Sequence, residues 1–250
     1  MPLEENIMKS NAKYPQSIVA VIGVILGIVM LTTVAFARNL NPGIAPINSS
    51  PHGKTYSEWA AAWWKWALQT PASVNPLTDP TGEHCNVNQS DHVWFLAGGA
   101  FGLSPVTRDC TVPEGQALFF PLINVFYGAF LTDPPDQRTE EFIRNQVACV
   151  GDATFNFVEI DGVQVNNPGQ YLEKSVIFDV FLPEDNIFKD LFNLDIPDLT
   201  LSPSVDEGFY LFVSPLKPGE HTIRWQASSE ACGFSQDITY HITVTKGGAH

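Results

Sequence analysis

Three side chains that can exchange protons or ligate metals stand close together in a turn-rich stretch. His84, Asp91 and His92 fall within residues 71–92, where proline, glycine and asparagine mark a loop. A neutral imidazole beside a carboxylate can act in acid–base catalysis or hold a metal ion. The chain has no HExxH spacing, and Cys85 is better used in a disulfide. We therefore treat the three as candidate ligand-contacting residues, and assign no catalytic residue and no metal ligand.

The other candidate ligand-binding feature is a stretch of aromatic residues. The stretch YSEWAAAWWKW holds four of the six tryptophans of the chain. On a helix, at about 100° per residue, Tyr56, Trp59, Trp63 and Trp66 form one stripe, and Trp64 lies beside it. The stripe is expected to seal the helix onto the body of the protein. Trp64 is expected to be the most exposed ring, able to stack on a sugar or on another apolar ligand.

Capping residues predict where the tryptophan helix begins and ends. Thr55 and Glu58 form a capping box, alanines fill the interior, and Pro71 stops the helix. A second helix is predicted over residues 137–150, after the turn DPPD, with acids in its first turn. A short helix is expected within residues 184–194.

The rest of the chain shows β patterns separated by glycine- and proline-containing turns. A proline at position 121 predicts an edge or a bulge in its strand, and Asp161-Gly162 predicts a hairpin turn. The fold class is therefore mainly β, a β-sandwich of immunoglobulin-like or jelly-roll-like type, with an N-terminal Trp-rich helix and one further helix. The strands are expected at residues 93–97, 116–126, 153–160, 163–165, 176–182, 208–213, 221–227 and 238–245.

An export signal is predicted at the N-terminus. Lys9 and Lys13 precede an apolar run at residues 17–37 that ends in Ala-Phe-Ala, a small-x-small cleavage site. Met8 would start a more ordinary signal than the acidic residues ahead of it. The run is also long enough to act as an uncleaved membrane anchor. The predicted organisation is a signal or anchor (1–37), a flexible leader (38–54), a single sandwich domain with helical additions (55–245) and a tail (246–250). The body is placed in the periplasm, in the medium or at the cell surface.

Cysteine usage agrees with export. The four cysteines all follow the signal, and an even number in an oxidising compartment predicts two disulfides. Three pairings are open, and we favour Cys85–Cys110 with Cys149–Cys232. A zinc site is disfavoured because no C-x-x-C spacing occurs.

The net charge of the chain disfavours two classes of binding partner. The formal net charge is −14, which disfavours nucleic acid and anionic lipid, since both require clustered cations. Membrane contact is expected only through residues 17–37, if uncleaved. No cofactor is expected. Calcium is the one ion that acidic loops could take, although no EF-hand spacing is present. The loop acids concerned are Asp133, Asp136, Asp185, Asp190, Asp195 and Asp198.

Several motifs together resemble a group of exported bacterial proteins without an assigned activity. They are the Y-x-E-W-x-x-x-W-W-x-W helix, T-G-x-x-C at 81–85, V-W-F-L-A-G at 93–98, R-x-C-x-V-P-x-G at 108–115, F-F-P at 119–121 and P-L-x-P-G-x-H-x-I at 215–223. The likeness covers about residues 54–245. It implies an exported single body and transfers no catalytic residue. The last strands are similar to the closing hairpin of immunoglobulin-like domains, at the level of fold only.

Three functions remain open. The first is an exported, non-catalytic binding or cell-surface module for a glycan, an apolar small molecule or a protein. The second is an extracellular hydrolase acting on a polysaccharide or related polymer, and the third is a structural envelope protein. The chain has no G-x-S-x-G elbow, P-loop or G-x-G-x-x-G motif, which favours the first.

Overall fold

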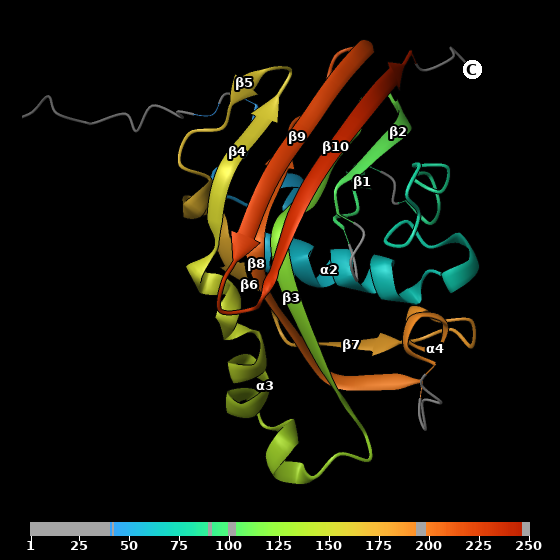
Figure 1. The fold of residues 1–250 in the computed structure, drawn as a ribbon, viewed down its shortest axis with the longest axis vertical. Coiled ribbons are helices and arrows are strands. Elements are labelled where there is room, and N and C mark those ends of the chain that lie inside the picture. Colours follow the sequence, from blue (N-terminus) through green and yellow to red (C-terminus); the bar gives the residue numbers. More distant parts are fainter. Residues whose placement is uncertain (1–40, 42, 90–91, 100–103, 194–198, 247–250) are drawn as a thin grey trace, which may run out of the picture. The chain divides into compact units, whose positions relative to one another are not determined.

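The computed structural model divides the chain into two units, residues 1–39 and 40–250. It describes residues 41, 43–89, 92–99, 104–193 and 199–246, all in the second unit; the side chains of Leu191 and Phe192 are excepted. The predicted export segment and Asp91 lie outside the described residues. Figure 1 shows the helices and strands of the second unit.

Two β-sheets form the body, which confirms the mainly β sandwich. Strands β1 and β3 run parallel, as do β2 and β10, and the other neighbours are antiparallel. The first sheet comprises β1 (Val93–Phe95), β3 (Ala117–Phe130), β8 (Thr200–Val213), β6 (Leu172–Lys174) and, also against β8, β7 (Phe178–Phe181). The second comprises β2 (Val106–Pro113), β10 (Phe234–Thr245), β9 (Gly219–Ser229), β4 (Thr154–Ile160) and β5 (Val163–Gln164).

Aromatic side chains hold the two sheets together. Phe120 of β3 stacks on Trp225 of β9 with ring centroids 5.2 Å apart, and Phe155 of β4 meets Phe209 of β8 at 5.0 Å. Successive residues of a strand point to opposite faces. Phe119 and Tyr210, stacked at 5.1 Å, therefore face away from the second sheet and toward helix α2. The unit thus has three layers: α2, the first sheet and the second sheet.

Helix α2 (Tyr56–Gln69) carries the tryptophans. Its capping box forms as predicted: the Glu58 backbone N–H donates to the Thr55 hydroxyl, and Glu58 accepts from the Thr55 backbone N–H over 2.8 Å. The stripe is buried, with Trp59 and Trp66 each 6% exposed and Trp63 1%. Each of these three indole N–H groups donates to a backbone carbonyl. The predicted role of the stripe, sealing α2 onto the sandwich, is confirmed.

The remaining helices are short. Helix α3 (Glu140–Val147) packs Ile143 and Val147 against Ala129 and Val205, where β3 and β8 extend past the second sheet (Figure 1). Helix α4 (Ile187–Phe192) falls in the segment predicted to be helical. Within the described residues there are also five 3-10 turns: η1 (Pro51–Gly53), η2 (Ala72–Val74), η3 (Pro135–Arg138), η4 (Ala148–Asp152) and η5 (Pro168–Tyr171). No described helix is long and apolar enough to cross a membrane.

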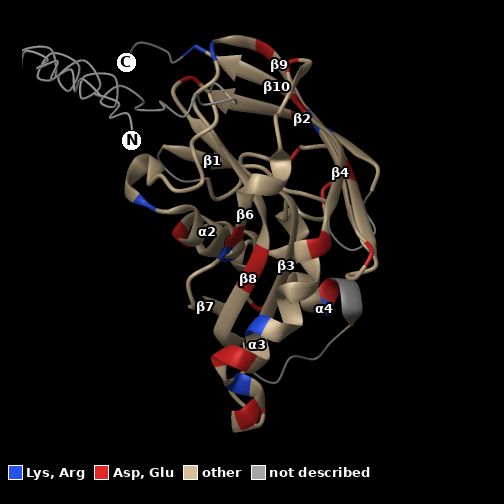
Figure 2. Ribbon diagram, turned by 90° about the vertical axis from the view of Figure 1, so that its left-hand side faces the viewer, with Lys and Arg blue, Asp and Glu red and all other residues tan. Residues whose placement is uncertain are grey.

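Two disulfides connect parts distant in sequence, with the predicted pairing. Cys85–Cys110 joins the loop after α2 to β2, and Cys149–Cys232 joins η4 to the turn between β9 and β10. Two such bridges fit an extracellular protein. Acidic residues, red in Figure 2, are spread over helices and strands of both sheets.

Two features differ from the simplest expectation. Strand β2 has no clear apolar pattern because one of its inward positions is Arg108, which is 1% exposed and donates to the carbonyls of Asp79, Ala97 and Gly98. Before α2, Ile44 is 4% exposed and forms a bridge to Val213, so part of the segment expected as a leader lies against the first sheet.

Candidate ligand-binding site

Trp64 occupies a different environment from the tryptophan stripe. It is half-buried, and its ring lies 4.8 Å from that of Phe126 on β3 and 5.0 Å, edge-on, from that of Trp63. The position follows from the helical wheel, since a residue just off the stripe points along the sheet surface and not into it. Trp64 is the least buried of the α2 tryptophans, as predicted.

A pocket of about 590 Å³ opens beside this ring. Its apolar wall includes Trp64, Leu68, Leu77, Phe126, Phe188 and Phe234, drawn from α2, β3, α4, β10 and the loop after α2. The volume lies within the range of about 300–1,000 Å³ usual for small-molecule sites, which are mostly apolar with a few polar groups. The shape and lining therefore suit a small apolar ligand.

A few uncharged polar groups interrupt the apolar wall. Gln236 of β10, 4% exposed, accepts a hydrogen bond from the Gly99 backbone N–H over 3.3 Å. The Ser104 hydroxyl accepts from the Asp237 backbone N–H over 2.9 Å. Asn124 of β3 donates through Nδ2 to the Tyr210 hydroxyl over 2.9 Å. These amides and hydroxyls are the groups that could orient a bound molecule.

A buried carboxyl lies directly behind the pocket. Asp206 of β8 is 0% exposed and pairs across the sheet with Phe126. Its Oδ2 accepts from the Trp64 indole N–H over 2.7 Å, and its Oδ1 accepts from the Tyr210 hydroxyl over 2.7 Å. Burial raises the pKa of Asp206 to about 8, against the lowering effect of these two hydrogen bonds. Asp206 is not itself among the residues lining the pocket.

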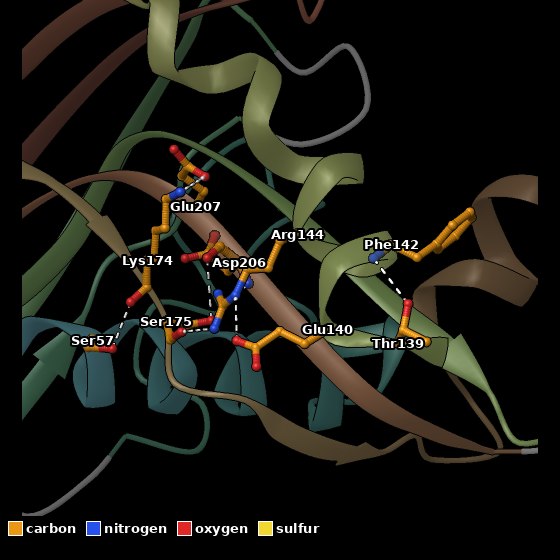
Figure 3. Close-up of polar contacts among 9 residues, drawn as sticks. All are labelled: Ser57, Thr139, Glu140, Phe142, Arg144, Lys174, Ser175, Asp206 and Glu207. Atoms are coloured by element: carbon orange, nitrogen blue, oxygen red, sulfur yellow. Dashed lines mark hydrogen bonds and ion pairs between the residues drawn. The ribbon is translucent and has the colours of Figure 1, made fainter. Parts of the chain in front are cut away.

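Charged and polar groups lie near Asp206 (Figure 3). The Asp206 backbone N–H donates to the Ser175 hydroxyl over 2.8 Å, and Arg144 of α3 donates to the Ser175 carbonyl over 2.8 Å. Arg144 also pairs with Glu140 at 3.4 Å. The neighbouring Glu207 pairs with Lys174 at 3.5 Å. Of these groups, Glu207 raises the pKa of Asp206 and Arg144 lowers it.

The sequence candidates are not brought together. His84 lines a separate polar depression beside Asp79, which accepts its backbone N–H over 2.8 Å. His92 precedes β1, and its ring lies 6.4 Å from that of His52. Neither histidine lines the Trp64 pocket, and Asp91 lies outside the described residues. Whether these residues contact a ligand stays a prediction.

No cluster of histidine, cysteine or acidic side chains suited to a metal occurs among the described residues. Of the six loop acids considered for calcium, Asp195 and Asp198 lie outside the described part.

Four residues of this region escaped sequence reasoning: Asn124, Asp206, Tyr210 and Gln236. One signal existed, since β8 carries the adjacent acids Asp206 and Glu207 within a strand that is otherwise largely buried. A buried acid requires partners, and one of the two side chains that donate to Asp206, Trp64 of α2, lies 142 residues away in sequence.

Comparison with known proteins identifies no relative: the chain matches no protein-family model, no curated protein and no solved structure. The site must therefore be interpreted from its own geometry and chemistry.

Proposed function

We propose that this protein is an exported binding module that holds a small apolar molecule in the Trp64 pocket. The observation that carries the proposal is the 590 Å³ pocket with its aromatic wall. The predicted signal, the two disulfides and the resemblance to exported bacterial proteins support a place outside the cytoplasm.

The wall favours an apolar ligand over a glycan. A sugar needs hydrogen-bond partners for many hydroxyls, whereas the polar side chains lining this pocket are Asn124, Gln236 and two serines. The indole N–H of Trp64 already donates to Asp206 and is not free for a sugar hydroxyl. The ring therefore offers its apolar surface only.

The lining favours binding over hydrolysis. Among the described residues that line the pocket there is no aspartate, glutamate, histidine, lysine or cysteine. A polysaccharide hydrolase generally requires a pair of carboxyl groups on either side of the scissile bond. The buried Asp206 has both oxygens engaged by Trp64 and Tyr210. A purely structural envelope role would leave the pocket without a use.

Calorimetric titration of the disulfide-bonded protein with naphthalene tests the proposal. Phe188 is half-buried on the pocket wall, and Phe188→Ala is expected to weaken naphthalene binding about tenfold. The matched control is Phe181→Ala, because Phe181 is 63% exposed and does not line the pocket.

Cellobiose and maltose serve as the alternative probes. The proposal predicts that neither disaccharide binds in the concentration range where naphthalene does. Binding of either sugar in a Trp64-dependent manner, with no naphthalene binding, would support the glycan alternative and overturn the proposal. Equal losses in the Phe188→Ala and Phe181→Ala proteins would place the naphthalene site elsewhere.

A further inference from the structure

We propose that Asn124 determines which hydrogen-bonding group a ligand of the Trp64 pocket must carry, and that Asp206 sets this preference through Tyr210. With Asp206 ionised, Asn124 presents its carbonyl oxygen to the pocket and selects a hydrogen-bond donor. With Asp206 protonated, Asn124 presents its amino group and selects an acceptor. The inference rests on the proposed function and names the ligand class of the same site.

The three side chains form one continuous chain from the pocket to the buried carboxyl. Asn124 lines the pocket and donates through Nδ2 to the Tyr210 hydroxyl at 2.9 Å. Tyr210, 0% exposed, donates to Asp206 Oδ1 at 2.7 Å. The Asn124 contact is the one hydrogen bond of that side chain among described residues. With the amide nitrogen directed at Tyr210, the carbonyl oxygen is left for the pocket.

This arrangement is the one that an ionised Asp206 requires. A carboxylate only accepts hydrogen bonds, so Tyr210 must donate its single proton to it. The Tyr210 oxygen can then only accept from Asn124, which fixes the amide nitrogen on that side. The other carboxylate oxygen accepts from Trp64 at 2.7 Å, so both oxygens are satisfied.

Protonation of Asp206 reverses the donor–acceptor direction of the hydrogen bonds that link Asp206, Tyr210 and Asn124. On Oδ2 the acid proton would have no acceptor among the described residues, because the one group bonded to that oxygen is the Trp64 N–H, which only donates. It must therefore lie on Oδ1 and be donated to the Tyr210 oxygen. Tyr210 then needs an acceptor for its own proton, since leaving a buried donor unpaired is costly. A half-turn of the Asn124 amide supplies its carbonyl oxygen and directs the amino group into the pocket.

The groups facing Asp206 from its neighbours allow such a change of protonation. Trp64 of α2 and Tyr210 of β8 donate to it, Arg144 of α3 lies beyond Ser175, and Glu207 is its chain neighbour. Lys174 of β6 pairs with Glu207 at 3.5 Å and not with Asp206. No ion pair to Asp206 occurs among the described residues, which is consistent with a pKa raised by burial to about 8.

Gly208 allows Asn124 to approach β8 closely enough to reach Tyr210. It lies between Asp206 and Tyr210 on the same face of β8 and pairs across the sheet with Asn124. A Cβ at Gly208 would meet the Asn124 Cβ and would lie 2.8 Å from the Ile123 carbonyl oxygen. The absence of a side chain therefore lets Asn124 lie against β8, within reach of Tyr210.

The orientation of the amide can be measured without any ligand. Above the titration midpoint of Asp206, the Asn124 amide protons should give a strong nuclear Overhauser effect to the Tyr210 ring, and below it this effect should be lost. In Asp206→Asn, the new amide donates to Tyr210 as the neutral acid does, so the effect should be absent at every pH. Asp152→Asn is the control, because Asp152 binds Ser229 and Ala231 at the surface and not the pocket.

Two bicyclic probes test the ligand preference. Indole carries a donor and no ring acceptor, whereas quinoline carries an acceptor and no donor. Calorimetry at about pH 6 and about pH 10, on either side of the Asp206 midpoint, should show the ratio of their dissociation constants shifting about tenfold toward indole at the higher pH. Asp206→Asn and Tyr210→Phe should abolish that shift, while Asp152→Asn should retain it.

The two measurements separate this inference from the proposed function. If the Asn124 amide reorients with pH but none of the probes binds, the proposed binding function is overturned. Only the pH-dependent orientation of Asn124 is then kept, as a property of the fold. Probes that bind while the Tyr210 contact persists at every pH would keep the binding function and overturn this inference. A pH-dependent ratio that survives in Tyr210→Phe would also overturn it.

Discussion

The indole nitrogen of Trp64 donates to Asp206 Oδ2 over 2.7 Å, which joins the least buried tryptophan of α2 to a carboxyl that is 0% exposed. This bond fixes the ring that lines the pocket and partly satisfies an acid that the sheet has removed from water. It therefore couples the helix and the pocket wall to the protonation of a residue on β8.

The stability of the protein should fall as the pH rises toward the pKa of Asp206. That pKa is raised to about 8 in the folded protein, whereas an unfolded carboxyl titrates at about 3.9. Between the two values the folded state holds a proton that the unfolded chain has lost. The stabilisation from this group is complete below the unfolded pKa and is lost as pH rises through about 8.

Urea unfolding over this pH range measures whether the stability falls as the pH rises. The free energy of unfolding of the parent, minus that of Asp206→Asn, should decrease with pH by up to about 1.4 kcal/mol per pH unit. Asp152→Asn should show no such slope between about pH 5 and 8, because Ser229 and Ala231 hold the pKa of Asp152 below its ordinary value. A difference that is flat or rises with pH for Asp206→Asn would contradict the buried neutral acid.

Trp64→Phe should raise the pKa of Asp206 further. The indole hydrogen bond is one of the contacts that lower this pKa, and phenylalanine keeps a ring but has no N–H. Carbon NMR titration of the Asp206 carboxyl measures the midpoint directly. Trp66→Phe is the matched control, because the Trp66 N–H donates to the Val87 carbonyl. A lower midpoint in Trp64→Phe would show that the indole does not stabilise the carboxylate.

Trp63→Ala should be severely destabilising. Trp63 is 1% exposed, and its N–H donates to the Leu96 carbonyl over 3.0 Å. Large-to-small replacement of such a residue costs about 3–5 kcal/mol. Phe181→Ala, at a position 63% exposed, should stay within about 0.5 kcal/mol of the parent. Equal thermal melts for the parent and Trp63→Ala would mean that the stripe does not seal α2 onto the sheet.

Gly208→Ala should perturb the hydrogen bonds between Asn124, Tyr210 and Asp206 by a steric clash and not by a change of charge. The added methyl would collide with Asn124 and lie 2.8 Å from the Ile123 carbonyl oxygen, so β3 and β8 must separate locally. We expect a loss of about 1–3 kcal/mol and a weaker contact between Asn124 and Tyr210. Gly151→Ala is the control, because its methyl would meet Glu207 at an ordinary 3.8 Å. Matching stabilities of the two variants would refute the steric argument.

The two disulfides should differ in how much each stabilises the folded protein. They enclose sequence separations of 25 and 83 residues, and the chain-entropy model gives the longer loop about 1 kcal/mol more. Urea unfolding of Cys149→Ala/Cys232→Ala and Cys85→Ala/Cys110→Ala provides the comparison. The reverse order would indicate that structure retained in the unfolded chain, and not loop length, controls the two effects.

Local patterns sufficed for the elements whose signals are short-range. The capping box at Thr55 and the stop at Pro71 bound α2, because both act within a few residues. Asp161 and Gly162 both have positive φ, as the predicted hairpin turn requires, and the bulge beside Pro121 is present. Strand β2 was not predicted, because the buried Arg108 conceals its alternation, and its guanidinium donates through Nε and Nη1 to carbonyls from other segments.

The sequence left three cysteine pairings open, and the tertiary structure decided for the one that we favoured. By itself the sequence determined the helical stripe, the off-stripe position of Trp64 and the β class. These follow from periodicities and turn chemistry carried by neighbouring residues. Only the tertiary structure decided what Trp64 faces, because Asn124, Tyr210, Asp206 and Gln236 reach it from β3, β8 and β10. A pocket and a buried acid depend on which strands become neighbours, and a change of one residue in register would turn Asp206 to the other face.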